Sequence, residues 1–159
     1  MIQNNTERTG WRDQQISARH RLYGSNVPAV DIDFLLIEYD RSQPKALIEY
    51  KHMNSYLGDD VDLNHPNYRA IANLANGFSQ VNLVGQLQPA PLPFYIVRYD
   101  FDPWWYRILP GNEAARQQSQ LDGWVNVTEV EYVSWLHRLR GRNVIEPMFQ
   151  FDNVKPWEN

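Results

Sequence analysis

The amino-acid sequence predicts a mixed α/β domain in which helices flank a small mixed sheet. Three patterns carry this prediction: an apolar strand that returns as a hairpin, two further strands near residue 100, and helical segments before, between and after them. The expected order is therefore helix, strand hairpin, helix, strand, strand and helix. An order of this kind is typical of helices packed on a small sheet.

The first expected element is a helix over residues 11–23. Thr9 is a suitable N-cap, and Gly24 can end the helix because glycine tolerates a left-handed backbone. Apolar side chains recur at only a few positions here, and the helical periodicity is thin.

The strongest strand pattern covers residues 30–39, and residues 46–51 form the return strand. The run 34–37 is apolar on both faces, which indicates a strand buried on both sides under packed helices. A connection over residues 40–44 joins the two strands. Pro44 lacks a backbone N–H, so we expect it in this connection and not in the ladder.

A polar loop over residues 52–64 precedes the second helix. Pro66 suits the first helical position, with Asn64 or His65 as the cap, and Gly77 ends the helix. The apolar residues of this helix lie at helical spacing and are expected to face the sheet: Tyr68, Ile71, Ala72 and Ala75.

Two strands and a last helix follow. Residues 94–99 form a strand, and residues 105–109 are its expected hairpin partner. Thr128 and Glu131 have the spacing of a capping box, which opens a helix that continues to about Leu139.

Composition limits the class of protein. Without repeats or an obvious linker, residues 1–159 are expected to form a single domain, with 110–159 as a C-terminal helical extension. The absence of cysteine excludes disulfides and thiolate metal sites, and it fits a cytoplasmic protein. The polar N-terminus does not resemble a signal peptide, and no apolar segment is long enough to span a membrane. A net charge of −4 argues against non-specific coating of nucleic acid.

Two pairs of charged residues at the same spacing interrupt the apolar hairpin. Asp31 and Asp33 are two positions apart in the first strand, so they project from the same face of that strand. Glu49 and Lys51 have the same spacing in the return strand. A carboxylate within an apolar run is costly to bury unless it is paired or binds a metal.

The register of the hairpin decides which aspartate approaches the return strand. A turn centred on Arg41 places Asp33 opposite Glu49, whereas a turn centred one residue later places it opposite Lys51. Both registers gather these three side chains on one face. We therefore expect Asp33 to be the main ligand, with Asp31 as a supporting residue or an alternative.

Two carboxylates and a lysine are a coherent set for metal-assisted hydrolysis. Carboxylates hold a hard cation such as Mg²⁺ or Mn²⁺. Such a cation polarises a phosphate and lowers the pKa of a bound water. The lysine can orient that water, help to deprotonate it, or steady the developing charge.

Asp33, fifteen intervening residues and Glu49-Tyr50-Lys51 together resemble the PD-(D/E)XK nuclease motif. The surrounding elements are similar to the restriction-endonuclease-like αβββαβ core, and the resemblance covers roughly residues 9–100. The family has three strands before its first long connection, where only two are clear here. A short strand therefore lies within residues 24–29, or the hairpin is displaced by one strand from the family pattern. Pro28 also stands further from the aspartates than the family's proline does.

The resemblance implies roles for the motif residues. Asp33 and Glu49 would coordinate the metal, together with the backbone carbonyl of Tyr50, and Lys51 would assist the water. The family often adds an acid or a glutamine from the first helix. Four residues could complete the site in this way: Glu7, Asp13, Gln14 and Gln15.

Other polar residues have both a functional and an ordinary interpretation. His52 could contact phosphate or metal, although a solvated strand end is its more frequent role. Arg19 and His20 could reach a DNA backbone, or they could form only the polar face of the first helix. The densest basic run could bind phosphate or complement a helix dipole. It consists of Arg138, Arg140 and Arg142.

Three hypotheses about function follow. The leading hypothesis is a Mg²⁺- or Mn²⁺-dependent nuclease that hydrolyses phosphodiester bonds of nucleic acid, with DNA as the favoured substrate and a homodimer as an open alternative. The second is an inactive nuclease-like domain that binds nucleic acid or protein. The third is partner binding at the aromatic cluster 104–106, where packing or an oligomer contact is more frequent than stacking on bases.

Overall fold

The computed structural model describes residues 19, 22, 32–38, 41–53, 61–101 and 103–141. The chain divides into two compact units, Met1–Asp31 and Ile32–Asn159. In the first unit, Arg19 is helical and its carbonyl oxygen accepts a hydrogen bond from the Leu22 N–H (3.0 Å). The remainder of the expected helix over 11–23 lies outside the described residues, as do residues 24–29.

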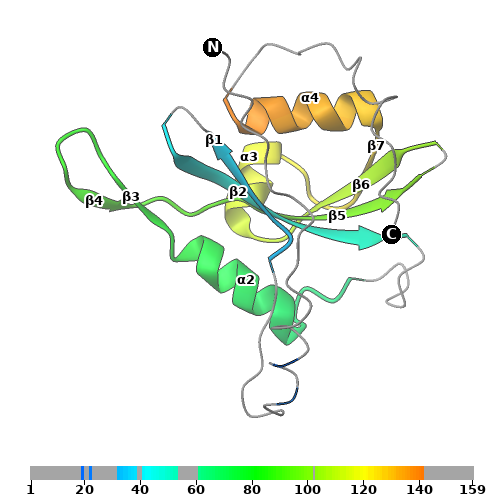
Figure 1. Cartoon of the computed structure of the whole chain (residues 1–159), viewed down its shortest axis with the longest axis horizontal. Coiled ribbons are helices and arrows are strands. Elements are labelled where there is room, and N and C mark those ends of the chain that lie inside the picture. Colours follow the sequence, from blue (N-terminus) through cyan, green and yellow to red (C-terminus); the bar gives the residue numbers. More distant parts are fainter. Residues whose placement is uncertain are drawn as a thin grey trace. The chain divides into compact units, whose positions relative to one another are not determined.

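The described part of the second unit is a mixed α/β fold with a five-stranded sheet, a separate two-stranded hairpin and three helices (Figure 1). In chain order the elements are β1 (Phe34–Glu38), β2 (Gln43–His52), α2 (Pro66–Asn76), β3 (Ser79–Val81), β4 (Leu87–Pro89), β5 (Phe94–Asp100), β6 (Trp105–Pro110), α3 (Glu113–Ser119), β7 (Val125–Thr128) and α4 (Glu129–Leu139). The mixed α/β prediction is confirmed. The restriction-endonuclease-like core stays a prediction.

The strand order in the large sheet is β1-β2-β5-β6-β7. Strands β2 and β5 are parallel, and the other neighbouring pairs are antiparallel. A parallel pair needs a crossover connection, which α2 and the β3–β4 hairpin supply between β2 and β5. The ends of β2 and β5 therefore lie together at one edge of the sheet.

Helices pack on both faces of the sheet. On one face, α2 buries Tyr68, Ile71 and Ala75 against Leu47 and Ile96. This burial explains why α2 forms where its apolar spacing predicts it. His65 is its N-cap and accepts a hydrogen bond from the Asn67 N–H at Nδ1 (3.3 Å), which decides between the two caps that the sequence left open.

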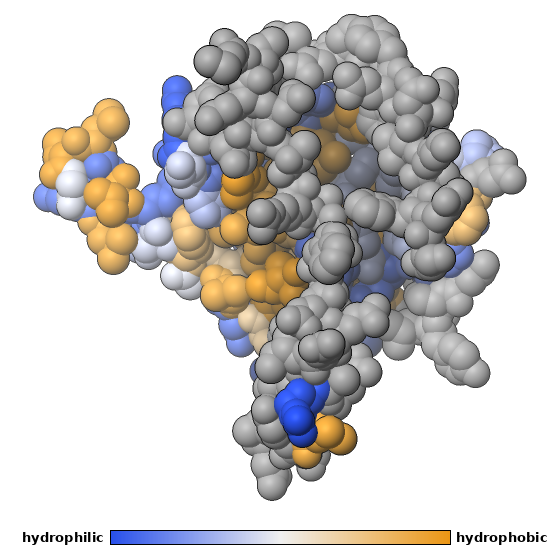
Figure 2. All heavy atoms as spheres, viewed as in Figure 1, coloured by the Kyte–Doolittle hydropathy of each residue, from blue (hydrophilic) through white to orange (hydrophobic). Residues whose placement is uncertain are grey.

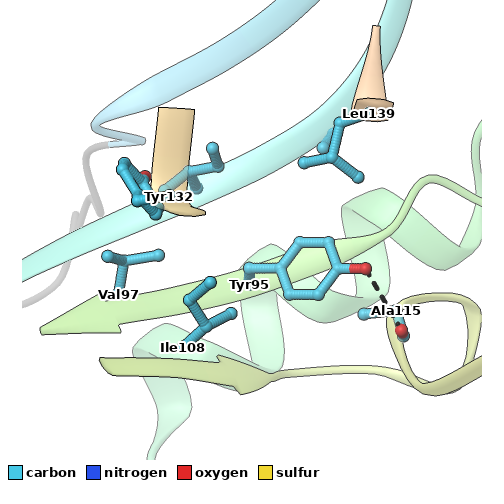
Figure 3. Close-up of a cluster of buried hydrophobic side chains, with 8 residues drawn as sticks. Tyr95, Val97, Ile108, Ala115, Tyr132 and Leu139 are labelled. Atoms are coloured by element: carbon cyan, nitrogen blue, oxygen red, sulfur yellow. Dashed lines mark hydrogen bonds between the residues drawn. The ribbon is translucent and has the colours of Figure 1, made fainter. Parts of the chain in front are cut away.

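The opposite face of the sheet carries a second core beneath α3 and α4 (Figure 3). Tyr95 lies at its centre, fully buried, and its hydroxyl donates a hydrogen bond to the Ala115 carbonyl oxygen (3.2 Å). Tyr132 and Leu139 reach this core from α4. The capping box predicted at Thr128 opens α4 and fixes its first turn.

The first hairpin differs from the sequence prediction at both ends. The expected strand over 30–39 is shorter, because β1 begins only at Phe34. Pro44 was expected in the connection, and this prediction is wrong: it pairs with Ile37 within β2. A β-bulge between Leu36 and Ile37 shifts the pairing there, and a bulge is one of the places where a sheet tolerates proline.

The described part of the expected C-terminal helical extension is not purely helical. Besides α3 and α4 it supplies β7, which pairs with β6 and enlarges the sheet. Another element missed by the sequence interpretation is the β3–β4 hairpin, which lies in a charge-free stretch between Arg69 and Arg98. Figure 2 shows hydrophobic side chains gathered on this hairpin, where Leu83 is fully exposed. Among the described residues, no helix has the length and apolar character that a membrane span requires.

Candidate functional site

Asp33 and Glu49 meet where β1 begins. Phe34 pairs with Ile48, so the same register continued by one residue places Asp33 opposite Glu49. The sequence left two registers open. The observed pairing of Asp33 with Glu49 is the register expected for a turn centred on Arg41.

The Asp33 side chain replaces a ladder hydrogen bond, which explains why β1 does not extend further back. Asp33 Oδ2 accepts a hydrogen bond from the Tyr50 N–H (2.8 Å). The N–H groups of Leu47 and Met53 donate to carbonyl oxygens on the side of β5. Backbone groups along a strand point alternately to its two neighbours, so every second residue of β2, counted from Leu47, faces β5. Tyr50 turns the other way, with its N–H and carbonyl on the same side. Its carbonyl, the expected backbone ligand, therefore points to the β1 side of β2, where Asp33 lies.

Glu49 is a buried carboxylate with one unsatisfied oxygen. The residue is 7% exposed. Its Oε1 accepts a hydrogen bond from Lys51 Nζ (2.5 Å), whereas Oε2 has no hydrogen-bond partner. Burial raises the pKa of Glu49, the bond to Lys51 partly offsets this, and the nearby charge of Asp33 raises it further. A buried carboxylate with a free oxygen needs a further partner.

Lys51 stays charged beside Glu49. Its side chain is 27% exposed, more than that of Glu49 at 9%. Burial alone would lower the pKa of Lys51, but the hydrogen bond and charge of Glu49, with a smaller contribution from Asp33, raise it overall. At neutral pH Lys51 is therefore a cation and a hydrogen-bond donor, and it is poorly suited to act as a base.

A cavity of about 140 Å³ opens in front of Glu49 and Lys51. Its other wall comes from the segment before α2 and from the first turn of that helix. The residues that line it are Glu49, Lys51, Val61, Asp62, His65, Asn67 and Tyr68. Residues from two distant parts of the chain thus enclose the two motif side chains.

Tyr68 is the residue of this cavity that the sequence interpretation assigned only to the core. It is 5% exposed, and its hydroxyl has no hydrogen-bond partner. Burial raises the pKa of Tyr68, so the hydroxyl keeps its proton and remains a donor. The spacing of α2 did predict that Tyr68 faces the sheet, but not that it faces the carboxylate.

Arg98 adds a second cation on this face of the sheet. It pairs with Lys51 across β2 and β5, is 2% exposed, and donates from Nη2 to the Met53 carbonyl oxygen (2.7 Å). Its signal in the sequence was an arginine that directly follows the apolar run 94–97. Only the parallel pairing of β2 with β5 shows that it stands beside Lys51.

The donor set suits a hard cation with few protein ligands. Mg²⁺ is usually held by one or two carboxylates and completes its shell with waters and substrate phosphates. Asp33, Glu49 and the carbonyl of Tyr50 match this pattern, and the free oxygen of Glu49 offers a ligand position. Within the described ranges, no three His, Cys, Asp or Glu side chains group as a metal site.

Other residues selected from the sequence lie elsewhere. His52 alternates with Lys51 and so points to the other face, where its ring contacts Tyr99 and its Nε2 lies 3.8 Å from Asp100 Oδ1. Arg138 and Arg140 belong to the α4 side of the sheet. The structure therefore does not bring these three side chains to the cavity.

Arg140 has a partner of its own within the fold, since its Nε lies 3.9 Å from Glu38 Oε2. Arg138 is exposed. Asp31, Gln14, His20 and Arg142 lie outside the described residues, as do Glu7, Asp13 and Gln15. Arg19 belongs to the first unit, which is described by itself.

Comparison of the chain with protein-family models, with curated proteins and with solved structures gave no match. The nuclease interpretation therefore depends on the motif residues and on the geometry around Glu49. The class that fold and site define is a mixed α/β protein with a buried carboxylate–lysine pair at a cavity.

Proposed function

We propose that this protein is a metal-dependent nuclease that hydrolyses phosphodiester bonds of nucleic acid, with DNA as the favoured substrate. One observation carries the proposal. Glu49 is a buried carboxylate that lines a cavity and has one oxygen without a hydrogen-bond partner, with Lys51 bound to its other oxygen and Asp33 opposite it in the hairpin.

The burial of Glu49 is difficult to explain by stability alone. Burying a charge is costly. Lys51 offsets only part of this cost, because it satisfies one oxygen of Glu49 and leaves the other without a partner. A bound cation would satisfy that oxygen and would also neutralise the repulsion between Glu49 and Asp33. The cost of this arrangement without a ligand therefore supports a binding role.

Asp33, Glu49 and the Tyr50 carbonyl would hold the Mg²⁺ or Mn²⁺ ion. When bound, the ion would polarise the phosphate and make a bound water more acidic. Lys51, a charged donor, would hydrogen-bond an oxygen of the phosphate and stabilise the negative charge that develops there. The protonated hydroxyl of Tyr68 would donate to the substrate from the opposite wall of the cavity.

The direct test is a cleavage assay on single-stranded, duplex and branched DNA and on RNA, with Mg²⁺, with Mn²⁺ and with a chelator. We expect metal-dependent cleavage of at least one substrate. Glu49→Gln and Lys51→Ala should each reduce it by roughly a hundredfold or more, as expected for loss of a group that acts in the transition state. Glu113→Gln is the matched control, because Glu113 is an exposed acid on α3.

The proposal fails if no substrate is cut with either metal, or if Lys51→Ala cuts as fast as the unaltered protein. Folding of each variant is checked by circular dichroism, so that loss of structure is not mistaken for loss of chemistry.

A second candidate is an inactive nuclease-like domain that binds nucleic acid or protein. It is favoured by the fact that both carboxylates already have partners: Glu49 bonds Lys51, and Asp33 accepts from the Tyr50 N–H. Calorimetric titration with Mn²⁺ separates the two candidates. The nuclease should bind the ion and lose this binding in Glu49→Gln, whereas the inactive domain should show no binding in either form.

A further inference from the structure

Two exposed aromatic side chains lie between β5 and β6, and we call Phe101 and Trp104 the aromatic turn. Phe101 is 55% exposed and Trp104 is 50% exposed. Their ring centroids lie 5.9 Å apart. Two exposed aromatic rings side by side offer a flat apolar surface that a ligand can cover.

Neighbouring rings hold the Trp104 indole in a fixed orientation. It lies nearly parallel to the ring of Tyr99, with centroids 6.0 Å apart, and to that of Tyr106, at 6.3 Å. Tyr106 in turn stacks on the buried Tyr132 at 4.1 Å. The exposed half of the indole is therefore backed by rings that reach the core, which reduces the ordering that binding to it requires.

The aromatic turn and the candidate site lie on opposite faces of the sheet and approach each other at one edge. Strands β2 and β5 are parallel and end at the same edge, where the Met53 N–H donates to the Tyr99 carbonyl oxygen (2.9 Å). The ring of His52, which points to the face opposite Lys51, lies 5.4 Å from the Phe101 ring, so the aromatic turn borders the far side of this edge from the cavity. One ligand that crosses this edge of the sheet could contact both the cavity and the aromatic turn.

We propose that the aromatic turn stacks on an unpaired base of a nucleic-acid strand whose backbone enters the Glu49–Lys51 cavity. The choice of nucleic acid as ligand rests on the proposed nuclease function. Every base has a flat face that can stack on an aromatic ring, whatever the sequence. Asp100 borders the turn and repels phosphate, so this surface suits base faces better than a phosphate backbone.

The same chemistry selects the form of the nucleic acid. Within an intact duplex the base faces are covered by neighbouring pairs, and a blunt duplex exposes only the outer faces of its two terminal pairs. A single strand or a frayed end therefore offers many more free base faces to Trp104. The protein should therefore prefer single-stranded or frayed substrates over blunt duplexes.

The test measures binding separately from cleavage. The affinity of the full chain for a fluorescently labelled oligothymidylate strand and for a blunt duplex is measured by anisotropy, in chelator and at low salt. We expect tighter binding of the single strand. Trp104→Ala should weaken it by roughly 5- to 150-fold, the effect of losing one base–aromatic stack. Phe101→Ala should weaken it too, and Trp104→Phe should restore much of the binding.

Leu83→Ala is the matched control, because it removes an exposed apolar side chain from the β3–β4 hairpin and should change nothing. Circular dichroism checks that Trp104→Ala and Phe101→Ala are folded. The inference is overturned if both variants bind the single strand as tightly as the unaltered protein does. It is also overturned if the duplex binds as tightly as the single strand, or if no nucleic acid binds. If stacking is seen but no metal supports cleavage, the inference stands and the proposed hydrolysis fails. If the protein cleaves nucleic acid but both variants bind it as tightly as the unaltered protein does, the proposed hydrolysis stands and the stacking inference fails.

Discussion

Replacing Glu49 by glutamine should stabilise the metal-free protein at neutral pH. Oε2 of Glu49 is buried without a hydrogen-bond partner, and an unsatisfied buried polar group costs about 1–3 kcal/mol. The amide oxygen of glutamine can still accept the hydrogen bond from Lys51, but this bond is weaker because the acceptor is no longer charged. The amide also replaces the negative charge near the Asp33 carboxylate with a hydrogen-bond donor. We expect a net gain of about 1 kcal/mol, since the weaker bond to Lys51 cancels part of the benefit.

The gain should depend on pH in a defined direction. The pKa of Glu49 is raised in the folded protein, chiefly by burial, so the folded state binds this proton more tightly than the unfolded chain does. As pH rises from the ordinary pKa of 4.5 through the folded value, the unfolded chain loses the proton first, and stability falls. Glu49→Gln lacks this loss, so its advantage should be present near neutral pH and absent below about pH 4.5.

Thermal unfolding followed by circular dichroism gives the measurement. A gain of 1 kcal/mol corresponds to an increase in Tm of about 2–4 °C for a chain of this size. Adding Mn²⁺ should reverse the order, because only a protein that binds the ion is stabilised, by about 2.7 kcal/mol at a hundred times Kd. Two results would refute this reasoning. One is a Tm of Glu49→Gln below that of the unaltered protein in chelator at neutral pH. The other is a difference in Tm between the two proteins that neither acid nor Mn²⁺ changes.

Three further predictions concern the scaffold around the site, each measured by denaturant unfolding. Ile71→Ala, at a position 2% exposed beneath α2, should cost about 2–5 kcal/mol, whereas Leu74→Ala on the exposed side of the helix should stay within about 0.5 kcal/mol; equal effects would mean that α2 does not pack as described. Gly111→Ala would place a Cβ 2.6 Å from Phe94 Cδ1 and should cost about 1–3 kcal/mol, and an unchanged midpoint would show that the ring moves freely. Thr128→Ala removes the capping box of α4 and should cost about 0.5–2 kcal/mol, while Thr128→Ser should keep most of the stability; a Ser variant as weak as the Ala variant would argue against the cap.

Local sequence patterns predicted the elements whose signals are contained within a few residues. The alternation of the first hairpin placed Asp33, Glu49 and Lys51 on one face, because strand periodicity fixes the face of each side chain whichever turn is used. The N-cap of α2 and the capping box of α4 were equally local. The fold class followed from the order of these elements.

Long-range pairing was beyond such patterns. Strand β7 and helix α3 were not predicted, because their short sequences gain stability only from burial against β6 and the core. Likewise, no local signal distinguishes a β3–β4 hairpin in a charge-free stretch from a loop of similar composition.

For the candidate site, the sequence by itself determined which charged residues share the hairpin face. The tertiary structure alone decided that Asp33 stands opposite Glu49, that Arg98 lies beside Lys51, and that Tyr68 closes the cavity in front of them. The physical reason is the crossover from β2 through α2 to β5. It joins residues far apart in the chain, and its geometry is set by the burial of both faces of the sheet at once, which no single segment encodes.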